Sequence, residues 1–280
     1  MASELVSMLY ALASGLAWGT GDFSGGMASR RTSVLIVVIL SQTIGIICLL
    51  SVIALFSEPF PQWPDLFFGA CAGMAGVIGL ITFYQGLANS PMGIVAPIAA
   101  AISAMLPVLV SFALEGLPAV SRILGLALAI AAIWIISQAG ETASMQLRHL
   151  RLPAIAGLGF ASFFILIDQV SQGAVFWPLV AARCTTLPLL ACIILGKRLW
   201  QVPPRRQFPV IIMAGVFDTA GNALFALAAN VGRLDMSAVL ASLYPATTVL
   251  LAWFILQERL NRKQWMGVIA ALVAVVLMAL

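Results

Sequence analysis

Long apolar runs separated by short polar stretches follow one another from one end of the chain to the other. Each run approaches the roughly 20 residues that an α-helix needs to cross the hydrocarbon core of a bilayer. Charged residues, prolines and glycines mark the breaks between the runs. The pattern predicts an all-α membrane protein with ten transmembrane helices, at residues 5–28, 32–57, 65–89, 92–114, 119–138, 153–172, 175–196, 208–230, 234–257 and 264–280.

Composition points to the same class. Apolar residues make up 62% of the 280 positions and charged residues only 9%, whereas about a quarter of a soluble domain is charged. Such an inventory can cover a lipid-facing surface but not a water-soluble one. The net charge of +4 comes from basic residues clustered between the apolar runs. We therefore expect a lipid bilayer as partner and no nucleic acid. The four cysteines lie inside apolar runs without metal-ligand spacing, so we expect no metal site.

The two halves of the chain match each other at a constant shift of about 142 residues, close to half its length. The matches are Gly15 with Gly157, Trp18 with Phe160, Gly73 with Gly215, Gly79 with Gly221, Phe83 with Phe225 and Gly125 with Gly267. This shift predicts two five-helix repeats, at residues 1–141 and 142–280. Because five is odd, the repeats would enter the membrane in opposite orientations, and inverted repeats are typical of secondary transporters.

Three short motifs carry a family resemblance: Gly15-Leu-Ala-Trp-Gly19, Leu240-Ala-Ser-Leu-Tyr-Pro245 and Leu256-Gln-Glu-Arg-Leu260, the last followed by Gln264 and Gly267. In these motifs the chain resembles the ten-span EamA-type branch of the drug/metabolite transporter superfamily, with aromatic amino acid exporters among the closer look-alikes. The first half departs from the pattern, since Glu115 is followed by Gly116. The resemblance implies a multi-pass protein of the bacterial inner (plasma) membrane. It also implies a central cavity lined by the first, third, fourth, sixth, eighth and ninth spans.

Ionisable residues inside the spans are the first candidates for a substrate pathway, because a charge in lipid is costly and usually functional. Asp22 and Asp168 lie late in their spans, where the carboxylates could instead reach water. Asp218 lies in the middle of the eighth span, one turn before Asn222, and could bind a proton or a substrate ammonium group. Arg183 in the seventh span could neutralise one of these carboxylates, which would make a structural ion pair instead.

Aromatic residues are the second group of candidates, because an aromatic face suits apolar and cationic solutes alike. Trp18, Tyr84 and Tyr244 could line the pathway, whereas Trp177 beside Pro178 is typical of the aromatic belt at a membrane surface. The predicted pathway residues are Trp18, Asp22, Tyr84, Asp168, Asp218, Asn222 and Tyr244.

One string favours an enzyme. Gly19-Thr-Gly-Asp22 matches the G-x-G-D motif of intramembrane aspartyl proteases, but that chemistry needs a second aspartate on the preceding helix. The string lies in the first predicted span, and the chain carries no H-E-x-x-H, Walker A or dinucleotide motif. We therefore expect no enzyme, no catalytic residue and no cofactor.

The function that fits best is a secondary transporter exporting amino acids, aromatic ones among them, or related small metabolites by alternating access. The alternatives are an uncoupled facilitator or channel and, less favoured, a membrane-embedded enzyme. Its partners would be the small-molecule substrate, the bilayer and, for coupling, protons, in a monomer or weak homodimer. Lysines and arginines concentrate in the first, fifth, seventh and ninth loops, which places both termini outside. The family resemblance places them in the cytoplasm.

Overall fold

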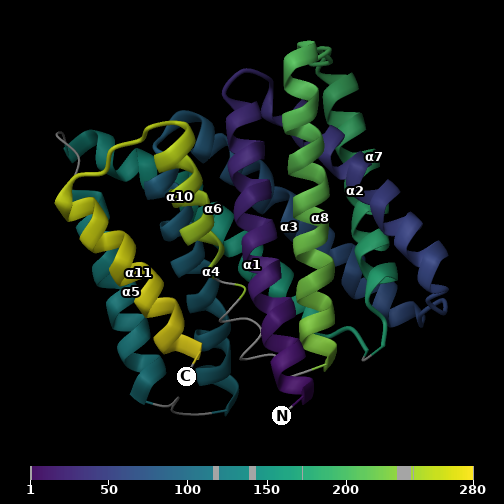
Figure 1. The fold of residues 1–280 in the computed structure, drawn as a ribbon, viewed down its shortest axis with the longest axis horizontal. Coiled ribbons are helices and arrows are strands. Elements are labelled where there is room, and N and C mark those ends of the chain that lie inside the picture. The colour runs from purple at the N-terminus through teal and green to yellow at the C-terminus, as the bar shows by residue number, and fades with distance from the viewer. Residues whose placement is uncertain are drawn as a thin grey trace.

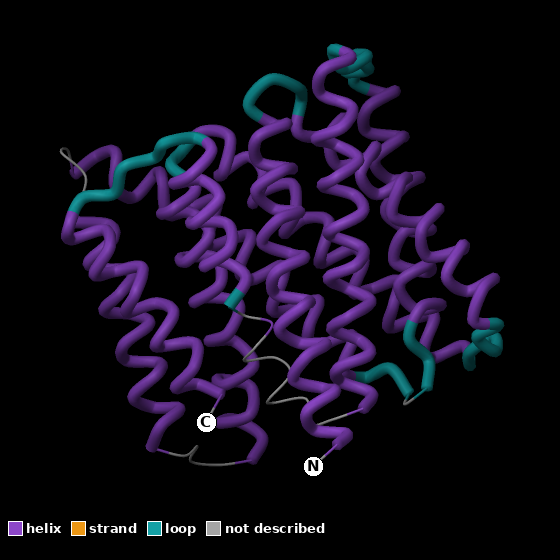
Figure 2. The backbone as a smooth tube through the Cα atoms, viewed as in Figure 1, coloured by secondary structure: helices purple, strands orange, loops and turns teal. Residues whose placement is uncertain are grey.

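A computed structural model of the chain describes residues 2–115, 120–138, 143–171, 173–231, 241 and 243–279. The regular elements in these ranges are all helices, which confirms the predicted all-α class (Figure 2). They are α1 (Ala2–Ser29), α2 (Val34–Phe56), α3 (Trp63–Asn89), α4 (Met92–Glu115), α5 (Val120–Gln138), α6 (Ala143–Asp168), α7 (Phe176–Gly196), the 3-10 helix η1 (Arg205–Gln207), α8 (Phe208–Val231), α10 (Tyr244–Ile255) and α11 (Arg262–Ala279).

Helix boundaries follow the predicted runs closely, with one clear exception. The sixth run was predicted to begin at residue 153, but α6 begins at Ala143, because polar residues interrupt an apolar run without ending a helix. Pro153 therefore lies inside α6. Residues 234–240 and 242 of the ninth predicted span lie outside the described residues.

Five helices are long and apolar enough to cross a membrane: Val34–Phe56, Trp63–Asn89, Leu150–Asp168, Phe176–Gly196 and Arg205–Ala228. Shorter apolar helices lie at Met92–Leu106, Ile123–Ala132 and Tyr244–Ile255. These lengths fit a multi-pass membrane protein. The count of ten spans stays a prediction.

The helices form one elongated bundle (Figure 1). The α5–α11 pair stands at one side, α1 and α8 run through the middle, and α2 and α7 form the other side (Figure 1). α1 begins and α11 ends at the same end of the bundle, and the loops after α1, α7 and α10 lie at the opposite end (Figures 1 and 2). These three loops hold many of the lysines and arginines.

Two antiparallel helix pairs build the centre, and both depend on glycines. Along α1 and α8, Ser7 Oγ donates to the Ala228 carbonyl at 2.9 Å, and Ser14 Oγ donates to the Gly221 carbonyl at 2.8 Å. A Cβ added to Gly221 would collide with the Trp18 ring. Without a side chain at such points, helix backbones can approach closely, and packing of this kind holds helices together in lipid.

The second pair, α3 and α6, repeats this contact, and like the first pair it joins one helix from each half of the chain. A Cβ on Gly79 would lie 2.9 Å from Cδ1 of Phe160. Trp18 and Phe160 correspond at the shift seen in the sequence, and so do Gly221 and Gly79. The matched residues therefore occupy matched contacts.

Candidate functional site

A cavity lies between these two helix pairs, near the middle of the helices that surround it. Its volume is about 60 Å³, enough for a few water molecules at roughly 10–15 Å³ each. It is lined by Trp18, Asp22, Gln42, Gly73, Gly76, Val77, Leu80, Phe160, Phe163, Phe164, Arg183, Asp218, Asn222 and Tyr244. Trp18, Asp22, Asp218, Asn222 and Tyr244 of the predicted pathway are thus brought together.

The set of helices around the cavity differs from the one that the family resemblance implied. No described residue of α4 lines it, because α4 packs against α6, α10 and α11 on one side of the bundle. Gln42 of α2 and Arg183 of α7 take part instead.

Aromatic rings form one wall of the cavity. The centroid of Trp18 lies 5.7 Å from that of Phe164 and 6.4 Å from that of Tyr244. Phe160 makes an edge-on contact with Phe83, with centroids 5.4 Å apart. Such distances are those of favourable aromatic pairs, so the wall is apolar and well packed.

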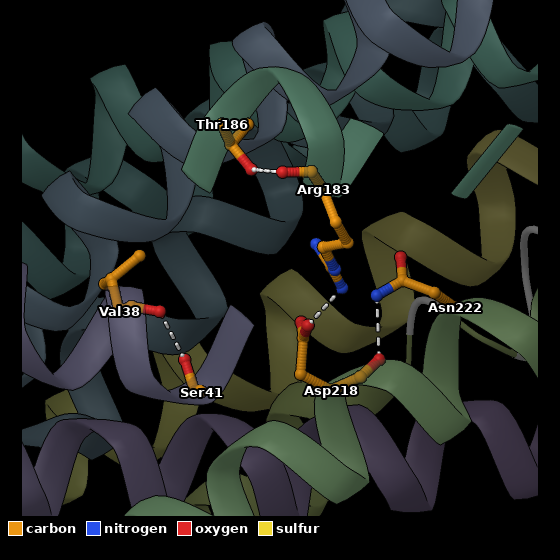
Figure 3. A network of polar contacts seen from close by, with 6 residues as sticks. All are labelled: Val38, Ser41, Arg183, Thr186, Asp218 and Asn222. Carbon is orange, nitrogen blue, oxygen red and sulfur yellow. Dashed lines mark hydrogen bonds and ion pairs between the residues drawn. The ribbon is translucent and has the colours of Figure 1, made fainter. Parts of the chain in front are cut away.

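Charged and polar groups form another part of the lining. Arg183 Nη2 donates to Asp218 Oδ2 at 2.7 Å, and Asn222 Nδ2 donates to the backbone carbonyl of Asp218, also at 2.7 Å (Figure 3). Gly45 of α2 leaves room for α8 beside this pair, since a Cβ there would collide with Thr219 Oγ1. Of the two alternatives that the sequence left open for Asp218, the structure shows the ion pair with Arg183.

Asp22 has a different environment. It is only 6% exposed, although its place late in the first span suggested access to water. The reason is that Asp22 lines the cavity inside the bundle. Among the described residues, Asp22 has no ion-pair or hydrogen-bond partner.

The remaining predicted pathway residues lie behind or away from the cavity. Tyr84 is fully buried behind the lining, its ring against Gly25 and its Oη without a hydrogen-bond partner. Asp168 is exposed at the end of α6 and does not line the cavity. Trp177 lies at the start of α7, where Nε1 donates to the Glu58 carbonyl at 3.2 Å.

Nine lining residues lie outside the predicted pathway set: Gln42, Gly73, Gly76, Val77, Leu80, Phe160, Phe163, Phe164 and Arg183. The repeat could have indicated Phe160, because it matches Trp18. Gln42 is one of few polar residues in the second apolar run, which is a weaker signal. In the described parts of the chain, no group of three or more His, Cys, Asp or Glu side chains could hold a metal ion.

Comparison with known proteins gives a family and a fold. The model of the EamA-like transporter family matches the chain twice, at residues 5–138 and 152–280. A solved crystal structure of a protein shares the fold with a TM-score of 0.68 at 16% identity, covering 98% of this chain and 96% of that one. No curated protein matches.

Proposed function

The chain belongs to the EamA-like transporter family, and on that basis we propose a secondary transporter that exports amino acids or related small metabolites by alternating access. Membership makes the chain a multi-pass membrane protein that moves small solutes, and members of the family are transporters rather than enzymes. The direction, the solute and the bacterial inner membrane as location are parts of the proposal.

The observation that carries this function is a cavity with charged groups in the middle of apolar helices, shared by the two family matches. Trp18, Asp22 and Gln42 come from the first match, and Arg183 and Asp218 come from the second. A site between two repeats can open to either side of the membrane when the repeats move against each other. We therefore place the repeats at residues 1–141 and 142–280, in inverted orientation across ten spans.

Contacts between the halves at both ends of the bundle support this movement. At one end, Arg30 Nη2 lies 2.7 Å from Glu258 Oε1. At the other, the Glu58 carboxylate accepts the backbone N–H groups of Phe176 and Trp177 at the start of α7. In alternating access, each set of contacts would break in one of the two states. The excess of basic residues favours the Arg30 end as the cytoplasmic one.

The aromatic wall favours solutes with an apolar body, aromatic amino acids among them. We include proton coupling and a monomer or weak homodimer in the proposal. An uncoupled facilitator is the second candidate, because the same cavity could pass solutes down their gradients without a coupling ion. Uphill flux driven by an imposed proton gradient separates the two mechanisms.

Flux in proteoliposomes tests the function directly. The purified chain should move at least one member of a panel of labelled amino acids, amines and nucleobases faster than protein-free vesicles do. Gly76→Val should reduce that flux, because the new side chain enters the cavity beside Phe163. Gly196→Val is the matched control, since nothing lies within 4 Å of a Cβ at that glycine. Absence of flux across the whole panel, or equal flux in the two variants, would contradict the function.

A further inference from the structure

The two carboxylates of the cavity differ in whether a cation balances their charge, and this difference indicates what the site binds. Arg183 is the one cation among the described residues that line it, and its guanidinium is bound to Asp218 at 2.7 Å. Asp22 has no such partner among the described residues and is 6% exposed. With both carboxylates ionised, the lining therefore carries one uncompensated negative charge.

An isolated carboxylate is costly in a low-dielectric interior, so Asp22 must hold either a proton or a cation. The surroundings favour a cation that comes with the solute. Asp22 and Trp18 are four residues apart on α1, and residues at this spacing share one helix face. The Trp18 ring in turn lies against Phe164, with centroids 5.7 Å apart. A solute whose cationic group binds Asp22 would thus place its apolar body against the aromatic wall. The rings of this wall also attract positive charge.

We propose that Asp22 binds the ammonium group of an organic amine that lacks a carboxylate, with the apolar body of the amine against Trp18 and Phe164. This rests on the proposed transport function and narrows its solutes to amines among the related small metabolites, in place of amino acids. A carboxylate on the solute would add a second negative charge beside Asp22, because the charge of Arg183 is already balanced by Asp218, 2.7 Å away. Asp218 is on this view a positioning residue, and Asp22 is the residue that contacts the solute.

The exchange of charge balances with one proton. Protonated Asp22 releases its proton to solvent when R–NH₃⁺ binds, and the resulting carboxylate and ammonium group form an ion pair. The reverse step regenerates the protonated carboxyl after the amine leaves. No other reactant takes part. One site thus holds amine and proton in turn, which is the requirement for exchanging one for the other across the membrane.

Binding to the purified full chain in detergent tests the proposal with four ligands of one shape. These are 2-phenylethylamine, 2-phenylethanol, phenylalanine and 3-phenylpropionate, which are cationic, neutral, zwitterionic and anionic. We expect the amine to bind most tightly and to release about one proton per molecule in weak buffer, as the charge balance requires. Tighter binding of phenylalanine, or amine binding without proton release, would overturn the proposal.

Variants give an independent result. Asp22→Asn should weaken binding of the amine by about 30-fold or more, as expected for removing one member of a buried charge pair, and should abolish proton release. It should leave the weak binding of 2-phenylethanol unchanged, which also reports that the variant is folded. Asp168→Asn should bind like the wild type, because Asp168 is exposed outside the cavity. Amine binding by Asp22→Asn within threefold of the wild type would overturn the proposal.

If Asp22→Asn does not fold, Asp22→Glu replaces it, because this variant keeps the charge and should retain both amine selectivity and proton release. The four-ligand series on the wild type tests amine binding without any variant. The outcome is separable from the transport function. Flux of phenylalanine or 2-phenylethanol without amine binding would keep the transporter and exclude the role of Asp22. Amine binding without flux of any solute would keep the role of Asp22 and exclude the transporter.

Discussion

The α1–α8 pair and the α3–α6 pair are built alike and carry different chemistry. Trp18 lies against Phe225 with centroids 5.5 Å apart, and Phe160 lies against Phe83 at 5.4 Å. Gly221 and Gly79 make room for the two rings that face them. These residues correspond one to one at the shift of about 142. The close helix contact and its aromatic packing are therefore common to both halves.

Polar residues break this likeness. At the same shift, Asp218 corresponds to Gly76, Asn222 to Leu80, and Asp22 to Phe164. Arg183 corresponds to Ser41, whose hydroxyl group donates to the Val38 carbonyl of its own helix at 3.0 Å (Figure 3). The packing that both repeats share thus forms the cavity. The charged residues that line it are present in one repeat and replaced by uncharged residues at the matched positions of the other. A duplicated bundle can gain a polar site in this way without losing the packing that holds it together.

The largest expected effect on the free energy of unfolding comes from breaking the Arg183–Asp218 ion pair, which has no counterpart at the matched positions of the first half. Arg183→Met should lower the free energy of unfolding by about 3–5 kcal/mol, because it leaves the Asp218 carboxylate buried and unpaired. The double variant Arg183→Met with Asp218→Leu should return to within about 1 kcal/mol of the wild type. Unfolding in mixed micelles measures both. A double variant no more stable than the single one would show that the pair is not the reason.

The likeness of the two pairs predicts equal sensitivity to a larger residue at the shared glycine. Gly221→Val and Gly79→Val should each cost about 1–3 kcal/mol, because the added methyl groups would overlap the Trp18 ring in one case and the Phe160 ring in the other. Thermal unfolding of both variants beside Gly196→Val is the measurement. A cost confined to one of the two glycines would mean that the contacts are not equivalent.

A smaller effect on the free energy of unfolding is expected at Glu58, a residue of the first half that caps α7 in the second half. Glu58→Gln should cost about 1–2 kcal/mol, because the charged carboxylate accepts N–H groups at the start of α7 and also interacts with the helix dipole. Proteolysis of the loop between α6 and α7 would report local opening at that end. Equal cleavage of the variant and the wild type would contradict the capping role.

The smallest effect is expected at the opposite end. Glu258→Gln should cost less than about 1 kcal/mol, because Arg30 and Glu258 are partly exposed, with side-chain exposures of 32% and 15%. The cost should shrink further in high salt, which screens exposed pairs. Unfolding at two salt concentrations provides the comparison, and a salt-independent loss larger than that of Glu58→Gln would reverse the order of the two ends.

Much of the fold could be predicted from the chain itself. Apolar runs of membrane-spanning length indicated the helices, and α2 and α8 lie almost where the runs placed them. Composition excluded a soluble surface before any contact was known. The glycine matches between the halves indicated the repeat, because a close helix contact needs a small residue at one particular position on each copy. All of these are properties of single helices or of sequence spacing.

Only the tertiary structure decided which polar groups meet. The sequence singled out Asp22, Asp168 and Asp218. Their spacing does not show that Asp218 faces Arg183, that Asp22 meets no ion-pair partner among the described residues, or that Asp168 lies outside the cavity. Lipid is as apolar as the helix surfaces, so burial of apolar area does not fix which faces turn inward. Packing among helices that are distant in sequence fixes which faces turn inward. This packing leaves one of three similar carboxylates in an ion pair, one without an ion-pair partner among the described residues, and one exposed.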